Sequence, residues 1–296
     1  MTPQSHQTHQ DQQAQQVQQT QPTHSNTQET NWVLQAESSP GVITLTLNRP
    51  DSFNALSTEM MDHLSAQLLE IESKPSARVL VLAAKGKAFC AGHDLKQMLN
   101  HQSLAEYQQL FEQCSSLMRQ IQSLSIPVIA KVEGIATAAG CQLVAQCDLA
   151  VAASHARFAV SGVNLGLFCS TPSVALSRNI GRKAAFEMLV TGGFIGAQDA
   201  LEKGLVNQVV EQNAIDEAVA ALAQSIVQKP KVAISLGKKL FYEQLELSME
   251  QAYARAGQTM ACNMMEPITL EGVQAFVDKR VPNWKTTGCS HEPRRQ

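Results

Sequence analysis

Short apolar runs, each followed by a turn or a glycine-containing loop, predict β-strands in the first half of the chain. From Val42 to Asn48 apolar residues and threonines alternate with a period of two, which is typical of a strand, and the chain then turns at residues 49–51. Residues 78–84 (RVLVLAA) and 127–132 (PVIAKV) are continuous apolar runs. Such runs are expected of strands buried on both faces.

Helical periodicity follows these strands. Ser57 can cap a helix that places four apolar residues on one face, namely Met60, Leu64, Leu68 and Ile71. A second helical pattern runs from about Tyr107 to Leu124. Because strand, loop and helix recur, we expect an α/β core with largely parallel strands.

The two ends of the chain differ from this core. Residues 1–30 are mostly Gln, Thr, Ser and His, so they cannot bury enough apolar surface to offset the entropy of ordering. We therefore predict a disordered, glutamine-rich tail at 1–30, a core at 31–229 and a helical C-terminal segment at 230–296. Helix candidates in that last segment lie near 231–246, 250–263 and 267–278.

Composition excludes several classes of function. The chain has 296 residues with a formal net charge of −3, which provides no global field for binding nucleic acid or an anionic membrane surface. No apolar run approaches the roughly 18 to 20 residues needed to cross a bilayer. The seven cysteines have no zinc-ligand spacing, so we expect reduced thiols and no metal site.

The N-terminus predicts a cytoplasmic protein. It has no apolar segment after a basic start, as a secretory signal would have. Mitochondrial transit peptides are rich in arginine, whereas the first basic residue other than histidine is Arg49. On this reasoning organelle import is disfavoured.

Two loops rich in small residues are candidates for the chemistry. Residues 86–96 (GKAFCAGHDLK) and 132–142 (VEGIATAAGCQ) each follow an apolar strand and lead into a helical pattern. A turn of this kind can leave backbone N–H groups without partners. For either loop alone, a tight turn or close helix packing is the alternative explanation. Together they predict two free N–H groups that converge.

Several motifs, in their order and spacing, resemble the crotonase (enoyl-CoA hydratase/isomerase) superfamily over about residues 33–285. They are residues 48–50 (NRP), 54–56 (NAL), 89–95 (FCAGHDL), 147–148 (CD) and 276–280 (FVDKR). Segments 136–142, 162–172 and 290–293 resemble one branch of it. The resemblance implies an α/β spiral of ββα units with a C-terminal helical segment. It also implies a homotrimer or a dimer of trimers.

By the same resemblance, the backbone N–H groups of His93 and Ala139 form an oxyanion hole for the carbonyl of an acyl-CoA thioester. Coenzyme A is then part of the substrate, and no cofactor is expected. The family pattern places further substrate-binding positions at Ala55, Ala91, Asp94, Leu95, Lys96, Asn164, Phe276 and Lys285. For the two lysines, a solvated surface charge is the competing interpretation.

This sequence differs from the family pattern at two positions that are important for catalysis in hydratases. Hydratases of this superfamily use two glutamates, and the corresponding residues here are Gln142 and Gly162. An amide has no accessible pKa near neutrality and glycine has no side chain, so neither residue can transfer a proton. We expect that restoring glutamate at both positions would create hydratase activity if the scaffold holds the substrate correctly.

Other residues could replace the glutamates. His93 and Cys169 could form a base and nucleophile pair, although a packed histidine and a buried thiol are the more common arrangement. Asp94 and Asp148 are expected to hold local turns. Three polar residues could position water or a polar part of the substrate, namely Asn164, Ser161 and Gln142.

Three functions therefore remain open from the sequence. The first is an enzyme of fatty-acid and acyl-CoA metabolism, and the second is an acyl-CoA-binding pseudoenzyme. The third is a decarboxylase of malonyl-type thioesters, in which the departing CO₂ generates the enolate and no base has to remove a carbon-bound proton. A histidine at position 93 also resembles some acyl-CoA decarboxylases of the superfamily.

Overall fold

A six-stranded sheet forms the centre of the protein in the computed structural model, which describes residues 31–100 and 103–284. Its strands, in spatial order, are β1 (Val33–Ser39), β2 (Val42–Leu47), β3 (Val79–Ala84), β5 (Val128–Val132), β7 (Leu149–Ala153) and β10 (Gln208–Val210). The β1–β2 pair is antiparallel, and the other neighbours are parallel. The strands β2, β3 and β5 confirm the three that the apolar runs predict.

A second, smaller sheet has four strands. It contains β4 (Ala88–Cys90), β6 (Ile135–Thr137), β8 (Arg157–Ala159) and β9 (Ile195–Gly196), of which the first three are parallel. Each core unit thus passes through one strand of the large sheet, one strand of the small sheet and then a helical turn or helix. This repetition is the spiral of ββα units that the family resemblance implies.

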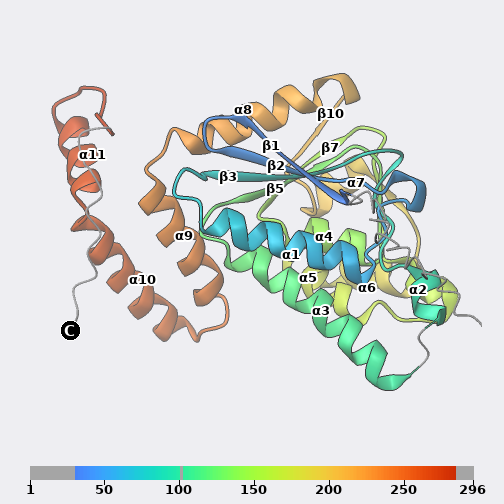
Figure 1. Cartoon of the computed structure of the whole chain (residues 1–296). Coiled ribbons are helices and arrows are strands. Elements are labelled where there is room, and N and C mark those ends of the chain that lie inside the picture. Colours follow the sequence, from blue (N-terminus) through green and yellow to red (C-terminus); the bar gives the residue numbers. More distant parts are fainter. Residues whose placement is uncertain (1–30, 101–102, 285–296) are drawn as a thin grey trace, which may run out of the picture. The chain divides into compact units, whose positions relative to one another are not determined.

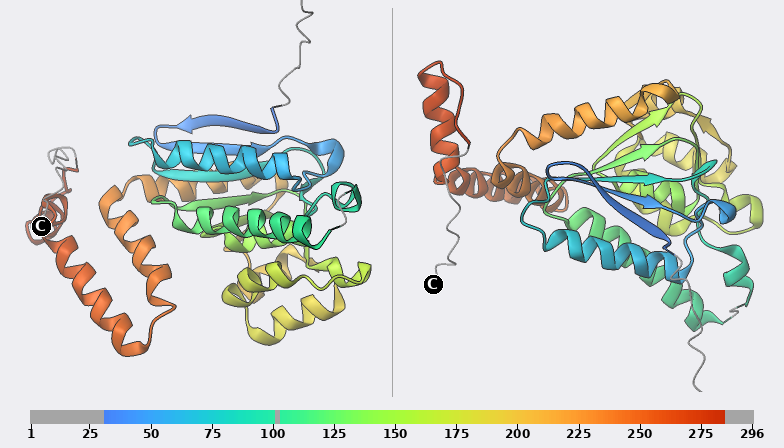
Figure 2. Two further views of the ribbon diagram at one scale, coloured as in Figure 1. Left: turned by 60° about the horizontal axis from the view of Figure 1, so that its bottom comes forward. Right: turned by 45° about the horizontal axis from the view of Figure 1, so that its top comes forward.

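Helices cover both faces of the large sheet (Figures 1 and 2). On one face α1 (Thr58–Glu72) packs against α3 (Leu104–Ser123), and on the other α8 (Ile215–Val227) packs over β3, β5 and β7. The hydroxyl of Ser57 accepts a hydrogen bond from the N–H of Met60 at 3.2 Å, which confirms the predicted cap of α1. The apolar face of α1 is buried as its periodicity predicts.

Shorter helical elements connect the strands and the long helices. They are η1 (Pro50–Ser52), α2 (Leu95–Asn100), α4 (Ala139–Gln146), η2 (Ser161–Leu165), α5 (Ser170–Asn179), α6 (Arg182–Thr191), α7 (Ala197–Lys203) and η3 (Gln212–Ala214). Because α2, α4 and η2 follow β4, β6 and β8, their first residues gather at one end of the small sheet.

The C-terminal segment is helical, as its periodicity predicts, and comprises α9 (Lys231–Gln244), α10 (Met249–Met264) and α11 (Pro267–Val277). Asp148 anchors α9 to the core. Its carboxylate accepts hydrogen bonds from the Lys238 ammonium and the Tyr242 hydroxyl, both at 2.7 Å, and from the N–H of Val128 at 2.6 Å. Asp148 therefore has the structural role expected of it, over a longer range than a local turn.

The described residues, 31–100 and 103–284, belong to one compact unit. The predicted tail at 1–30 lies outside the described residues. Within the described part of the chain, no helix is long and apolar enough to cross a membrane. The same residues contain no group of three or more His, Cys, Asp or Glu side chains that could hold a metal ion.

Candidate functional site

A cavity of about 650 Å³ lies where the parallel strands of the small sheet end. Residues that follow β4, β6 and β8 all contribute to its wall, for example His93, Ala139 and Gly162. The topology thus brings together the two small-residue loops that the sequence singles out. Clefts at the carboxyl ends of parallel strands are common ligand sites in α/β proteins.

Two backbone N–H groups at this cavity have no hydrogen-bond partner in the part of the chain that the structure describes. An isolated parallel bridge pairs Leu56 with His93, but it uses the carbonyl of Gly92 and the N–H of Asp94. The N–H of His93, and that of Ala139 at the start of α4, donate no hydrogen bond to any described residue. The two loops also approach closely, since a Cβ atom added to Gly92 would lie 3.2 Å from the nitrogen of Ala139.

The backbone around these groups is unusual. Ala138 has φ +50° and ψ −122°, a conformation that alanine rarely adopts and that the surrounding structure must hold in place. Gly140 allows α4 to approach β4, because a Cβ atom there would lie 2.0 Å from the carbonyl oxygen of Cys90. This close packing fixes the direction in which the first N–H groups of α4 point.

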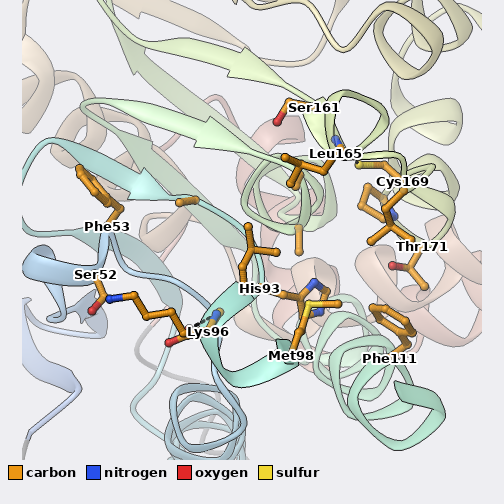
Figure 3. Close-up of a pocket in the computed structure, with 18 of the residues that line it drawn as sticks. Ser52, Phe53, His93, Lys96, Met98, Phe111, Ser161, Leu165, Cys169 and Thr171 are labelled. Atoms are coloured by element: carbon orange, nitrogen blue, oxygen red, sulfur yellow. Dashed lines mark hydrogen bonds between the residues drawn. The ribbon is translucent and has the colours of Figure 1, made fainter. Parts of the chain in front are cut away.

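Charged and polar residues line one end of the cavity. Arg49 Nη1 lies 3.1 Å from Asp94 Oδ2, an ion pair without ideal hydrogen-bond geometry. The same carboxylate accepts hydrogen bonds from the N–H groups of Lys96 and Gln97, so it also caps α2. Phe53 is 55% exposed with a positive φ, and it lies at this end with Lys96 (Figure 3).

His93 lies between this end and the opposite, apolar end, where Met98 and Phe111 line the cavity (Figure 3). Its ring packs edge-to-face against Phe111, with centroids 5.4 Å apart. The ring atom Nε2 is buried and has no hydrogen-bond partner among the described residues. Burial lowers the pKa of His93 to about 4, so the imidazole is neutral at neutral pH.

The two positions of the absent glutamates differ in the space they offer. Gln142 is buried, is not part of the cavity wall, and its Oε1 has no partner among the described residues. Gly162 lines the cavity and donates its N–H to the Sγ of Cys169 at 3.2 Å. A Cβ atom at position 162 would lie 2.4 Å from the carbonyl oxygen of Leu167 and 2.7 Å from that Sγ.

The His93 and Cys169 side chains do not form the pair that the sequence allows. No hydrogen bond joins them among the described contacts, and the Sγ of Cys169 instead accepts the N–H of Gly162. Burial also raises the pKa of the Cys169 thiol, which disfavours a thiolate nucleophile.

The structure brings most of the predicted site residues together. Those that line the cavity are Ala91, His93, Asp94, Leu95, Lys96, Ala139 and Gly162. Ala55 and Gln142 are buried outside its wall, and the amide of Asn164 donates to the carbonyl of Gly192 at 3.2 Å instead of lining it. Phe276 lies on α11, 87% exposed, and contributes to a different cavity. Lys285 lies outside the described residues.

Sequence reasoning missed several residues of the wall. Phe53, Met98, Phe111 and Leu165 line it, and none is marked by a periodic pattern. Of these four residues, only Phe53 could have been suspected from the sequence, because it is a large aromatic residue within a polar turn. The contributions from α2 and α3 depend on tertiary packing.

Comparison with known proteins gives consistent matches. The family model described as "Enoyl-CoA hydratase/isomerase" matches residues 37–287. A solved enoyl-CoA hydratase of Mycobacterium smegmatis is similar, with 59% identity and a TM-score of 0.85, covering 86% of this chain and 99% of that one. The structure of human enoyl-CoA hydratase domain-containing protein 3 has 40% identity and a TM-score of 0.83, covering 86% and 100%. The protein of that name from Danio rerio is 41% identical over 256 residues, which is 86% of this chain and 89% of the relative.

These relatives contradict the predicted cytoplasmic location. The proteins from Danio rerio, Xenopus laevis and Homo sapiens, at 41%, 43% and 42% identity, are all named mitochondrial. The prediction depended on the absence of arginine before Arg49 and is wrong by this comparison. An arginine count tests for only one property of an import signal.

Proposed function

This chain belongs to the enoyl-CoA hydratase/isomerase family, and from that premise we propose that its cavity binds an acyl-CoA thioester whose carbonyl oxygen accepts hydrogen bonds from the N–H groups of His93 and Ala139. The observation that carries this proposal is that two backbone donors in one cavity wall have no partner among the described residues. Backbone donors keep their function when side chains change. The histidine at position 93 is therefore compatible with this role.

The two ends of the cavity support one orientation of the ligand. Lys96 and Phe53 suit the phosphates and the aromatic base of coenzyme A, because an ammonium attracts phosphate and an aromatic ring can stack. The opposite end, where Figure 3 shows Met98 and Phe111, suits an acyl chain. The thioester then lies beside His93, between the two ends.

The chemistry that this site favours is stabilisation of a thioester enolate. Fixed donors aimed at a developing oxyanion act strongly in a site from which water is excluded, and losing one typically costs about 10²- to 10³-fold in rate. We place the reaction in acyl-CoA metabolism and do not assign hydration by two carboxylates. Gln142 cannot transfer protons, and Gly162 has no room for a side chain.

A second candidate is decarboxylation of a malonyl-type acyl-CoA. The observation that favours it is that, among the described residues, no carboxylate stands free at the end with Met98 and Phe111. The acidic side chains in the cavity wall are Asp51 and Asp94, and Asp94 is paired with Arg49. In this reaction the bond between the α-carbon and the carboxylate breaks, CO₂ leaves, and its bonding electrons form the enolate. The enolate then takes a proton from solvent at the α-carbon.

The C-terminal helices support self-association. Several large apolar side chains on α10 and α11 are exposed, among them Met249, Tyr253, Met260 and Phe276. A group of large apolar side chains exposed on neighbouring helices typically marks an interaction site. We therefore include a homo-oligomer, such as the trimer or dimer of trimers expected from the family, in the proposal.

A paired assay tests the function. Calorimetry would follow binding of crotonyl-CoA, and loss of the enoyl-thioester absorbance would follow its hydration. We expect binding without rapid hydration, and CO₂ release from methylmalonyl-CoA would then separate a decarboxylase from a pseudoenzyme. Absence of binding to crotonyl-CoA and to free coenzyme A would refute the proposal.

A further inference from the structure

The backbone of Ala138 has a conformation that glycine adopts readily and alanine does not. Its φ of +50° and ψ of −122° match the first central position of a type II′ turn, where glycine dominates. Phe53 also has a positive φ, but its ψ of 33° places it in the ordinary left-handed region. Alanine at position 138 therefore carries a conformational strain that glycine would not carry.

Backbone hydrogen bonds hold this conformation on both sides. The N–H of Ala138 donates to the carbonyl of Ala159 at 3.0 Å, and the carbonyl of Ala138 accepts the N–H of Gln142 at 3.1 Å. Glycine at position 138 could form both bonds equally well, because they use no side-chain atom. The methyl group is thus the one feature by which alanine differs from glycine here, and the strain indicates that this methyl has a function.

The methyl group lies where the two donor loops meet. A Cβ atom added to Gly92 would lie 2.9 Å from the Cβ of Ala138 and 3.2 Å from the nitrogen of Ala139. Because Gly92 directly precedes His93, the methyl packs against one donor loop while its own backbone leads into the other. Ala138 is half-buried and lines the cavity. The methyl therefore fills the space between the two loops at the cavity wall.

We propose that Ala138 is a positioning residue whose methyl group keeps the N–H groups of His93 and Ala139 at the separation at which both bind one thioester oxygen. The inference rests on the proposed function and adds a residue that acts through the two donors. Each donor must lie about 2.7–3.1 Å from the oxygen, so a small change in their separation weakens one of the hydrogen bonds. Without the methyl, the loops lose a packing contact and can shift into the gap.

The test compares wild type with Ala138→Gly by calorimetry on the full chain, using crotonyl-CoA and free coenzyme A. Only crotonyl-CoA has the thioester carbonyl, so the wild-type protein should bind it more tightly. Ala138→Gly should weaken binding of crotonyl-CoA about three- to tenfold, as expected for the loss of one hydrogen bond. Its affinity for free coenzyme A should change by less than about twofold, because that ligand does not use the two donors.

Further variants and thermal unfolding separate this role from ordinary packing. Ala138→Gly should unfold at the wild-type temperature or a few degrees above it, because relief of strain offsets the greater freedom of glycine in the unfolded chain. Ala138→Ser retains the Cβ atom and should retain the preference for crotonyl-CoA. Lys279→Gly is the matched control, because Lys279 also has a positive φ, of 54°, but does not line the cavity. It should leave both affinities unchanged.

Each contrary result has a distinct meaning. If Ala138→Gly keeps the wild-type preference for crotonyl-CoA, the inference is wrong while the proposed function stands. The inference is also wrong if this variant unfolds at a clearly lower temperature and loses affinity for both ligands alike, because the methyl then serves only packing. If the wild-type protein binds the two ligands equally, or binds neither, the carbonyl contact in the proposed function fails and the inference fails with it.

Discussion

At position 162 the backbone leaves no space for a side chain. A Cβ atom there would meet the carbonyl of Leu167 and the Sγ of Cys169, and the N–H of Gly162 is already bound to that sulfur. This arrangement changes the expectation drawn from the sequence, because a glutamate at this position cannot simply be restored. The loop that follows β8 would have to move first.

We therefore predict that Gly162→Glu destabilises the protein and creates no hydratase activity. Overpacking a tight site typically costs about 1–3 kcal/mol. Thermal unfolding and a crotonyl-CoA hydration assay would measure both effects. Gly193→Glu is a matched control, because Gly193 is exposed and a Cβ there meets nothing closer than 3.5 Å. Rapid hydration by Gly162→Glu, alone or with Gln142→Glu, would contradict this account of the loop.

His93 makes stability depend on pH. Its folded-state pKa of about 4 is below the ordinary value of 6.5 because burial disfavours the charged ring. The unfolded chain therefore takes up a proton as the pH falls below about 6.5, whereas the folded protein does so only near 4. Stability is lost across that window, by at most about 1.4 kcal/mol per pH unit.

Urea unfolding at pH 7 and pH 5 would measure this dependence. The wild-type protein should lose more stability between the two values than His93→Leu, which has no group that titrates at this position. Equal losses in the two proteins would show that the His93 ring is not buried in neutral form.

At the scale of the elements, a buried ion pair attaches α9 to the core of the protein. The Lys238 ammonium, almost fully buried, donates to Asp148 at 2.7 Å and to the carbonyls of Ile121 and Ile126 at 3.1 and 2.9 Å. These contacts join the C-terminal segment to α3 and to the residues that immediately precede β5 and β7. Removing one partner would leave the other charge buried and unpaired.

Lys238→Met should therefore destabilise the protein by about 3–5 kcal/mol. Adding Asp148→Asn should recover part of this loss, because the unpaired charge is then removed. Chemical denaturation of the single and double variants forms a double-mutant cycle, with exposed Lys239→Met as the control. Additive losses would mean that the pair is not coupled.

The sequence predicts the long elements better than the short ones. The strands β2, β3 and β5 and the C-terminal helices lie within a few residues of their predicted positions, because their apolar patterns are strong. The strands β4, β6 and β8 have three residues each, too few to show a period, and only their pairing in the small sheet defines them.

In the site, too, the parts marked by a local sequence pattern could be predicted and those that depend on tertiary packing could not. The loops around His93 and Ala139 stand out as small-residue segments after strands, so their convergence could be predicted. Thr171 and Phe111 approach the cavity from α5 and α3, and this approach depends on tertiary packing. The space at Gly162 is likewise a tertiary property.

For the whole molecule, the motifs identify the family correctly. The similarity to enoyl-CoA hydratase domain-containing protein 3, which the small-residue loop and segment 162–172 indicate, is confirmed at 40% identity in a solved structure. The predicted location failed because it depended on composition alone.

We predict that the protein self-associates through α10 and α11. Light scattering should give a mass that is a multiple of the 32.1 kDa chain. Replacing two exposed methionines, as in Met260→Glu with Met265→Glu, should lower that mass because charge opposes burial of this surface. A 32.1 kDa species at micromolar concentration in the wild-type protein would contradict the prediction.

The central claim is that two backbone donors hold the thioester oxygen. The most direct measurement is the vibrational difference spectrum of crotonyl-CoA labelled with ¹³C at its thioester carbonyl, free and bound to the protein. Hydrogen bonds from the N–H groups of His93 and Ala139 polarise the carbonyl, so its stretching band should move to lower frequency on binding. A bound ligand whose carbonyl band stays at its position in water, or moves to higher frequency, would contradict the account.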